Sequence, residues 1–276
     1  MILLDQAGAG EVCSAIFPPD PGLKGFVEHY WVQYSPAPEA CRTPWRIVPD
    51  ASPHIIVSVA RELRRLEDIR VSVVGARSRF VDVSLANRSL TLGFRLVPGT
   101  LPLLTRLPAS DFADCAVSME DSLGIQGKVL TDRLVHQQSA AQVLNVLSEF
   151  LRQRFRNERP PCRIGAHVGR VDRVEELACT LGVPSRTLYA RTKEQVGLTP
   201  KRLLRVQRLH RALVIRHERP TPWAHVAAMC GFADQAHLVR EFHELLGEAP
   251  GAWQERALAV EVSSATGASP NRQPIF

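Results

Sequence analysis

The side chains that could hold a metal ion or carry out covalent catalysis are scattered along this sequence. Its six cysteines include no Cys-x2-Cys pair, and no histidine stands beside them at the spacing of a zinc site. The first half contains no His-x-His or His-x3-Glu pair either. We therefore expect reduced thiols, no metal, no cofactor and no enzymatic activity.

The remaining chemistry is the recognition of negative charge. The net charge is +6, and its distribution is uneven. Residues 1–151 have a net charge of −2, whereas residues 152–256 have a net charge of +8. A basic segment beside a slightly acidic one predicts a polyanionic partner for the second half, although a merely solvated basic face is the alternative interpretation.

The elements that must position these charges divide the 276 residues into two domains. We expect an α+β fold. Residues 1–155 form a β-rich, cupin-like or small-barrel domain, with short β-branched runs up to residue 97 and closing amphipathic helices after it. Two prolines and two glycines without periodicity predict a linker over 156–168. Residues 169–256 are helical in period, and the Ser-, Gly- and Pro-containing tail 257–276 is expected to be disordered.

The sequence shows no membrane or secretion signal. It contains no apolar run approaching the roughly 18 residues that span a bilayer, and its first ten residues carry no Lys or Arg before an apolar stretch. We therefore expect a soluble, cytoplasmic protein without a membrane partner.

An internal repeat in the second half organises the basic segment. The pattern Ala178-x3-Gly182 recurs as Ala227-x3-Gly231 at an offset of 49 residues. A small residue inside a first helix, followed by a glycine with positive φ and a second helix, predicts a helix-turn-helix in each copy. Beyond the glycine the offset becomes 50, in the pairs Leu188 and Leu238, Gly197 and Gly247, and Pro200 and Pro250.

The two copies, VEELACTLGVPSRTLYARTKEQVGLTPKRLLRVQRLHRAL and WAHVAAMCGFADQAHLVREFHELLGEAPGAWQE, together resemble the DNA-binding domain of AraC/XylS-type transcriptional regulators. The resemblance implies a transcription factor that binds double-stranded DNA. It also implies one recognition helix in each copy and a linker helix between them, here about Pro200 to Arg216. The first copy departs from the family pattern at Ala190-Arg191-Thr192, where a usual contact residue and a usual core aromatic are missing.

Helix geometry and the family's positions together select the side chains that face DNA. Arg186 is the strongest base-reading candidate, Gln235 suits adenine, and Arg240 suits guanine or a phosphate. The full predicted interface comprises Ser185, Arg186, Thr187, Tyr189 and Ala190 in the first copy, and Gln235, Ala236, Val239 and Arg240 in the second.

The first half resembles the N-terminal domain of some AraC-type regulators of unassigned effector, in the stretches PPDPGLKGFVEHYWVQ, RIVPDASPHIIVSV and FRLVPG. The resemblance implies a domain that binds a small-molecule effector or forms a homodimer. The candidate residues that line an effector pocket are Trp31, Trp45, His54 and Arg95. The other interpretation is that these residues belong to an ordinary core. The alternative function is a catalytic or metal-binding β domain fused to a DNA-binding module.

Overall fold

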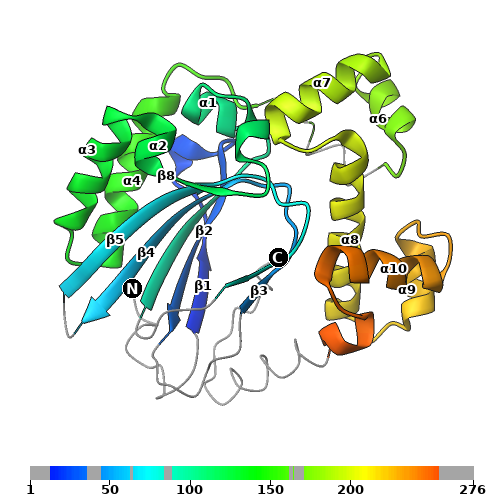
Figure 1. The fold of residues 1–276 in the computed structure, drawn as a ribbon. Coiled ribbons are helices and arrows are strands. Elements are labelled where there is room, and N and C mark those ends of the chain that lie inside the picture. The colour runs from blue at the N-terminus through cyan, green and yellow to red at the C-terminus, as the bar shows by residue number, and fades with distance from the viewer. Residues whose placement is uncertain are drawn as a thin grey trace.

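The computed structural model describes residues 13–35, 45–62, 65–83, 89–161, 164 and 171–254. Six of the thirteen residues of the predicted linker, 162, 163 and 165–168, lie outside the described residues, as does the whole predicted tail. The β-rich first half and the helical second half occupy separate regions of the molecule (Figure 1). The expected α+β architecture is confirmed, whereas the boundaries assigned to each domain stay predictions.

The first half is built on antiparallel sheets. Six strands form one sheet in the order β1-β2-β7-β4-β5-β8, and two short strands form a second ladder, β3-β6. The bounds of the large sheet are β1 Cys13–Phe17, β2 Val27–Ser35, β7 Ser89–Leu96, β4 His54–Glu62, β5 Arg65–Val74 and β8 Ala116–Ser118. Those of the small ladder are β3 Trp45–Ile47 and β6 Val81–Val83.

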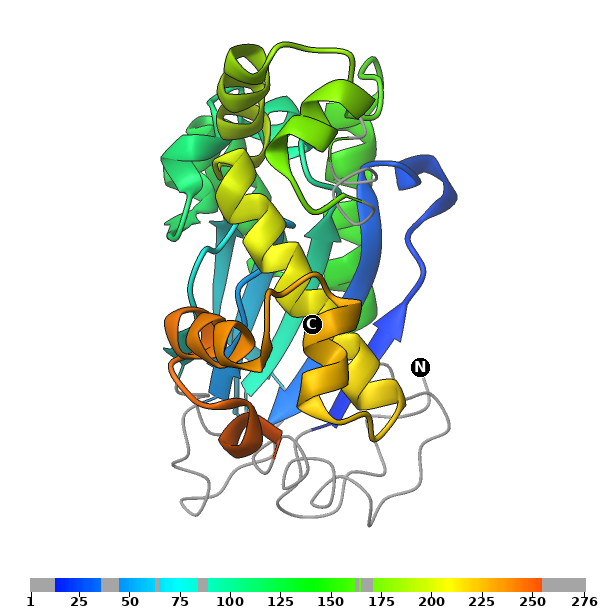
Figure 2. The same ribbon diagram turned by 90° about the vertical axis from the view of Figure 1, so that its right-hand side faces the viewer.

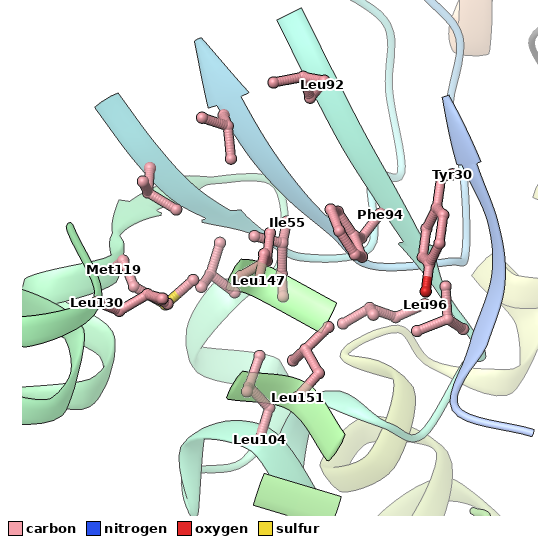
Figure 3. Packing of buried hydrophobic residues seen from close by; sticks show 14 of the residues in the cluster. Tyr30, Ile55, Leu92, Phe94, Leu96, Leu104, Met119, Leu130, Leu147 and Leu151 are labelled. Carbon is pink, nitrogen blue, oxygen red and sulfur yellow. The ribbon is translucent and has the colours of Figure 1, made fainter. Parts of the chain in front are cut away.

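One face of the large sheet is covered by helices. Alternate strand residues such as Phe94 and Ile55 are fully buried on this face, where they meet Leu147 and Leu151 of α4 (Figure 3). Because side chains alternate along a strand, the strand residues between these buried ones point to the opposite face of the sheet. The helical elements here are η1 Pro21–Leu23, α1 Leu101–Thr105, η2 Ala109–Phe112, α2 Met119–Leu123, α3 Ile125–Val135 and α4 Ala140–Phe155.

Apolar residues recur with a helical period from Asp121 to Val135, which predicts a continuous helix, but the structure interrupts it. Gly124 separates α2 from α3 with φ 58° and ψ −132°, which lies outside the helical region. The second helix then folds back so closely that a Cβ at Gly127 would lie 2.0 Å from the carbonyl oxygen of Met119. Periodicity alone therefore missed a break that the two glycines permit.

The second half contains two helical pairs at the ends of one long helix. Figure 2 shows α8 as a diagonal helix, with α6 and α7 at its upper end and α9 and α10 at its lower end. The bounds are α6 Val174–Thr180, α7 Ser185–Val196, α8 Pro200–Glu218, α9 Trp223–Met229 and α10 Gln235–Leu246. No helix among the described residues is long and apolar enough to cross a membrane.

Candidate nucleic-acid interface

The two helical pairs repeat the same turn. Gly182 and Gly231 have φ values of 63° and 76°, as the repeat predicted. The residue after each glycine donates its backbone N–H to the buried alanine of the first helix: Val183 to Ala178 and Phe232 to Ala227, both at 3.0 Å. Each pair is therefore a helix-turn-helix closed by an equivalent hydrogen bond.

The second helix of each pair starts differently in the two copies. In the second copy Asp234 is the N-cap, and its side chain accepts a hydrogen bond from the His237 N–H at 2.6 Å. In the first copy Pro184 occupies the N-cap position, and no side chain caps the helix. Both helices end at a glycine in the left-handed conformation, Gly197 and Gly247.

The first recognition helix, α7, turns its predicted contact residues to solvent. Leu188 is 1% exposed and anchors the inner face. Thr187, which precedes it, is half-buried. The four other predicted contacts are exposed: Ser185, Arg186, Tyr189 and Ala190. The side chains that would reach base edges therefore occupy the N-terminal part of an exposed helix face.

The second recognition helix, α10, has the same arrangement. Leu238 and Phe242 are completely buried. Three predicted contacts, Gln235, Ala236 and Arg240, are exposed, and Val239 is half-buried. The structure thus exposes most of the predicted interface in both copies, while contact with DNA itself stays a prediction.

The linker helix α8 holds the two pairs together through its arginines. Arg205 donates to the carboxylates of Glu241, at 2.8 Å, and Glu244 in α10. Arg208 donates to the backbone oxygen of Asp172, before α6, at 3.1 Å. The Arg205 pKa is raised because these two carboxylates stabilise its charged form. Both arginines therefore fix the positions of the helical pairs relative to α8.

Comparison with known proteins agrees with this geometry. Residues 177–256 match the family described as a helix-turn-helix domain, and residues 15–118 match a domain of unknown function, DUF6597. The transcriptional activator RhaR of Pectobacterium atrosepticum is 38% identical over 78 residues, which cover 28% of this chain and 27% of RhaR. The probable transcriptional regulator LumQ of Photobacterium leiognathi is 32% identical over 91 residues, covering 33% and 37%.

The C-terminal domain belongs to the AraC/XylS family.

The chain spans about a quarter of the length of RhaR and a little more than a third of the length of LumQ. Among solved structures, ToxT from Vibrio cholerae is similar over 88% of this chain and 97% of ToxT. The sequence identity is 10% and the TM-score is 0.41, so nothing about function follows from that likeness.

The first unit of the AraC/XylS domain has a buried threonine at the position where the family pattern has a core aromatic residue. Thr192 stands 50 residues before Phe242 and is likewise fully buried. Its hydroxyl donates to the Leu188 carbonyl oxygen at 2.8 Å, which satisfies the polar group inside the unit. Ala190 stands 50 residues before Arg240. The first recognition helix therefore presents a methyl group where the second presents a guanidinium.

Outside the AraC/XylS domain, three of the four candidate effector residues meet on the sheet face opposite the helix-covered core. The indole Nε1 of Trp31 (β2) donates to His54 (β4) at 3.5 Å, and Arg95 (β7) stands opposite His54 in the strand register. Both His54 and Arg95 contact Asp50, with His54 Nε2 3.1 Å from its carboxylate. The fourth candidate, Trp45, lies in β3, and its side chain is outside the described residues.

Sequence reasoning missed the acids that complete this network. Arg95 Nε donates to Glu28 at 2.6 Å, and its two other nitrogens bond the carboxylate of Asp50. The positive charge of Arg95 keeps the pKa of the buried Asp50 well below its ordinary value. Burial and the same arginine lower the pKa of His29 to about 4. Spacing alone does not reveal Glu28, because it lies at an irregularity in the pairing of β2 with β7.

The network is a cluster of ion pairs centred on Arg95. Among the described residues, no group of three His, Cys, Asp or Glu side chains is arranged to hold a metal ion. The carboxylates of Glu28 and Asp50 bond Arg95 instead. His210 of α8 contacts the carbonyl oxygen of Pro49, next to Asp50. The cluster therefore lies where the sheet touches the linker helix.

Proposed function

We propose that this protein is a sequence-specific DNA-binding regulator of transcription whose two recognition helices, α7 and α10, enter successive major grooves. One observation carries the proposal: two closed helix-turn-helix units stand at the ends of a single helix, each with most of its predicted contact residues exposed. The helix α8 has 19 residues, or about 28 Å at about 1.5 Å per residue. With the flanking units it spans roughly the 34 Å of one DNA turn.

The electrostatics supports the same function. The net charge of +8 over residues 152–256 favours association with DNA, because phosphate contacts release counterions. Arg186 and Arg240 read guanine edges or take a phosphate, and Gln235 reads adenine. Ser185, Thr187, Tyr189, Ala190, Ala236 and Val239 complete the surface against the groove. The function requires no catalysis and no cofactor, and we propose that the protein works in the cytoplasm.

We infer that the N-terminal domain modulates this binding through a small molecule or through dimerisation. The aromatic and charged side chains of Trp31, His54 and Arg95 gather on one sheet face, which suits a polar ligand. Two apolar side chains one turn apart on α3, Ile125 and Val129, are 82% and 54% exposed and suit a second copy of the chain. A catalytic β domain fused to the DNA-binding module is the alternative.

The direct test is selection of DNA from a randomised duplex library by the purified full chain. We expect enrichment of one sequence class, with an affinity that falls steeply as salt rises. The matched control is the double variant Arg186→Ala Arg240→Ala. It should melt at the wild-type temperature, because both residues are exposed, yet enrich nothing. Equal binding of all sequences by the wild-type protein would contradict sequence-specific recognition.

The N-terminal domain is tested in the same preparation. A thermal-shift screen of the full chain against small metabolites should give at least one stabilising compound, and that compound should change the affinity for the selected DNA. Light scattering reports the oligomeric state of the wild-type protein and of Ile125→Lys Val129→Lys. A stabilising metal ion with turnover of a substrate would instead favour the catalytic alternative.

A further inference from the structure

The end of the second recognition helix is capped by the other domain. The carbonyl oxygens in the last turn of a helix lack partners within the helix. In α10, the Leu245 oxygen accepts the backbone N–H of Phe80 at 3.0 Å. The Leu246 oxygen accepts a hydrogen bond from Nη1 of Arg46 at 2.9 Å. Arg46 lies in β3 and Phe80 immediately precedes β6, so both donors come from the small ladder of the N-terminal domain.

The guanidinium of Arg46 is held in the orientation that this contact needs. Its Nε and Nη2 donate to the two carboxylate oxygens of Asp82 at 2.7 and 2.6 Å. The group also lies over the Phe80 ring, 4.1 Å from the centroid. With two nitrogens fixed by Asp82, Nη1 is left to reach Leu246, and Glu248 lies 3.8 Å from the same atom. A cation at the negative end of the helix dipole is stabilising.

The glycine that ends α10 makes this close approach feasible. Gly247 has φ 73°, and a Cβ at this position would lie only 2.5 Å from the Phe80 ring. The equivalent Gly197 ends α7 against the N-terminal domain, where a Cβ would lie 2.7 Å from the Ala109 oxygen. Figure 1 shows α7 ending beside α1 and α10 ending beside β3. Both recognition helices therefore rest on the N-terminal domain by their C-terminal ends, while their N-terminal contact residues are exposed.

We propose that Arg46, oriented by Asp82, and Phe80 are positioning residues that hold α10 at a fixed place relative to α7. The first unit and the second unit are then braced by the same domain at two separate points. This brace sets the distance and rotation between the two half-sites that the protein accepts. The inference rests on the proposed function for its consequence in DNA recognition, but the docking of α10 is independent of DNA.

The experiment uses full-chain Arg46→Ala and Asp82→Ala. These variants change the net charge in opposite directions, yet both remove the oriented guanidinium. The matched control is Arg79→Ala, which removes one exposed positive charge from the residue next to Phe80. The probe is the duplex selected by the wild-type protein, together with the same duplex lengthened by two base pairs between its half-sites.

Two base pairs rotate one half-site by about 70° relative to the other. We expect the insertion to weaken binding of the wild-type protein and of Arg79→Ala by about tenfold or more. Binding by Arg46→Ala and Asp82→Ala should weaken by about threefold or less, because α10 is then held by α8 alone and can follow the displaced site. Unchanged spacing selectivity in both variants would overturn the proposal.

Hydrogen exchange without DNA provides the second readout. The Phe80 amide and the amides of the last turn of α10 should exchange about fivefold faster in Arg46→Ala and Asp82→Ala than in Arg79→Ala. If the wild-type protein selects no DNA, the proposed function fails, and faster exchange still supports docking. Equal exchange in all three variants refutes the docking of α10.

Discussion

The two helix-turn-helix units share a backbone plan but build their cores differently. The core of the second unit contains large aromatic side chains, with Phe232, Phe242 and Trp253 all buried. Trp223 packs edge-on against Phe242 with ring centroids 5.1 Å apart. This unit supplies most of its own apolar core.

The first unit depends on the N-terminal domain. Its core is aliphatic, with Leu177, Leu188 and Leu198, and it is completed by Ala51 and Ala76 from the sheet domain. The comparison teaches that a duplicated motif can preserve its turns and its glycine helix ends while its buried core is supplied from different parts of the chain. We therefore expect the first unit to respond to changes in the N-terminal domain, and the second to changes in its own aromatic residues.

The largest expected effect is on the second unit. Phe242→Ala should lower the free energy of unfolding by about 3–5 kcal/mol, because a fully buried ring leaves a cavity. Thr192→Ala at the matched position of the first unit should cost about 1 kcal/mol, since less volume and one hydrogen bond are lost. Chemical denaturation of both variants measures the difference. Equal losses would break the distinction between the two cores.

A substitution in one recognition helix should affect base preference in its own half-site only. Arg186→Ala and Arg240→Ala should each weaken binding to the selected DNA by about 1–3 kcal/mol, and each should relax base preference in one half-site. Arg191→Ala is the control in the first unit, because its side chain is rotated about 100° around the helix from the matched position. Competition binding against single-base variants provides the measurement. A uniform loss over all sequences would assign the arginine to a phosphate instead.

Acid should loosen the first unit before the second. The pKa of His29 is lowered to about 4, so between about pH 6.5 and 4 the unfolded chain binds a proton that the folded chain does not. Stability therefore falls as the pH falls through this window. The network reaches the first unit through Asp50, whose neighbour Ala51 lies in that unit's core.

Hydrogen exchange is compared between pH 7.5 and pH 5. Lowering the pH should increase the opening of α6 and α7 more than the opening of α10. The variant His29→Gln should flatten this pH dependence, because glutamine does not titrate. A pH response that is identical in the two units, or that survives in His29→Gln, would rule out transmission through this network.

The smallest expected effect concerns the hydroxyl of Thr192. Thr192→Val keeps the shape of the side chain and removes only its bond to the Leu188 oxygen, which the helix also satisfies. The free energy of unfolding should change by less than about 1 kcal/mol. Thermal melting of the variant and of the wild-type protein measures this change in the free energy of unfolding. A loss of more than about 2 kcal/mol would show that the first unit depends on this polar contact rather than on its aliphatic packing.

The helix-turn-helix units could be predicted because their signals are local. The positive φ of Gly182 and Gly231 follows from a repeat whose residues lie only a few positions apart. The linker helix was also anticipated, although it extends to Glu218 rather than Arg216.

The long-range contacts could not be predicted in this way. Arg46 and Leu246 are 200 residues apart in the sequence, and nothing near either residue indicates the other. The repeat paired Gly247 with Gly197, but the approach of Gly247 to Phe80 is visible only in the tertiary structure. In the same way, Glu28 and Asp50 became visible only when the strand register placed them beside Arg95.

The central claim is that two unequal recognition helices on one linker helix read DNA together. Hydroxyl-radical footprinting of the full chain on its selected duplex tests this most directly. We expect two protected stretches on one face of the duplex, with centres about one helical turn, roughly 10 base pairs, apart. One protected stretch alone, or two on opposite faces, would contradict it.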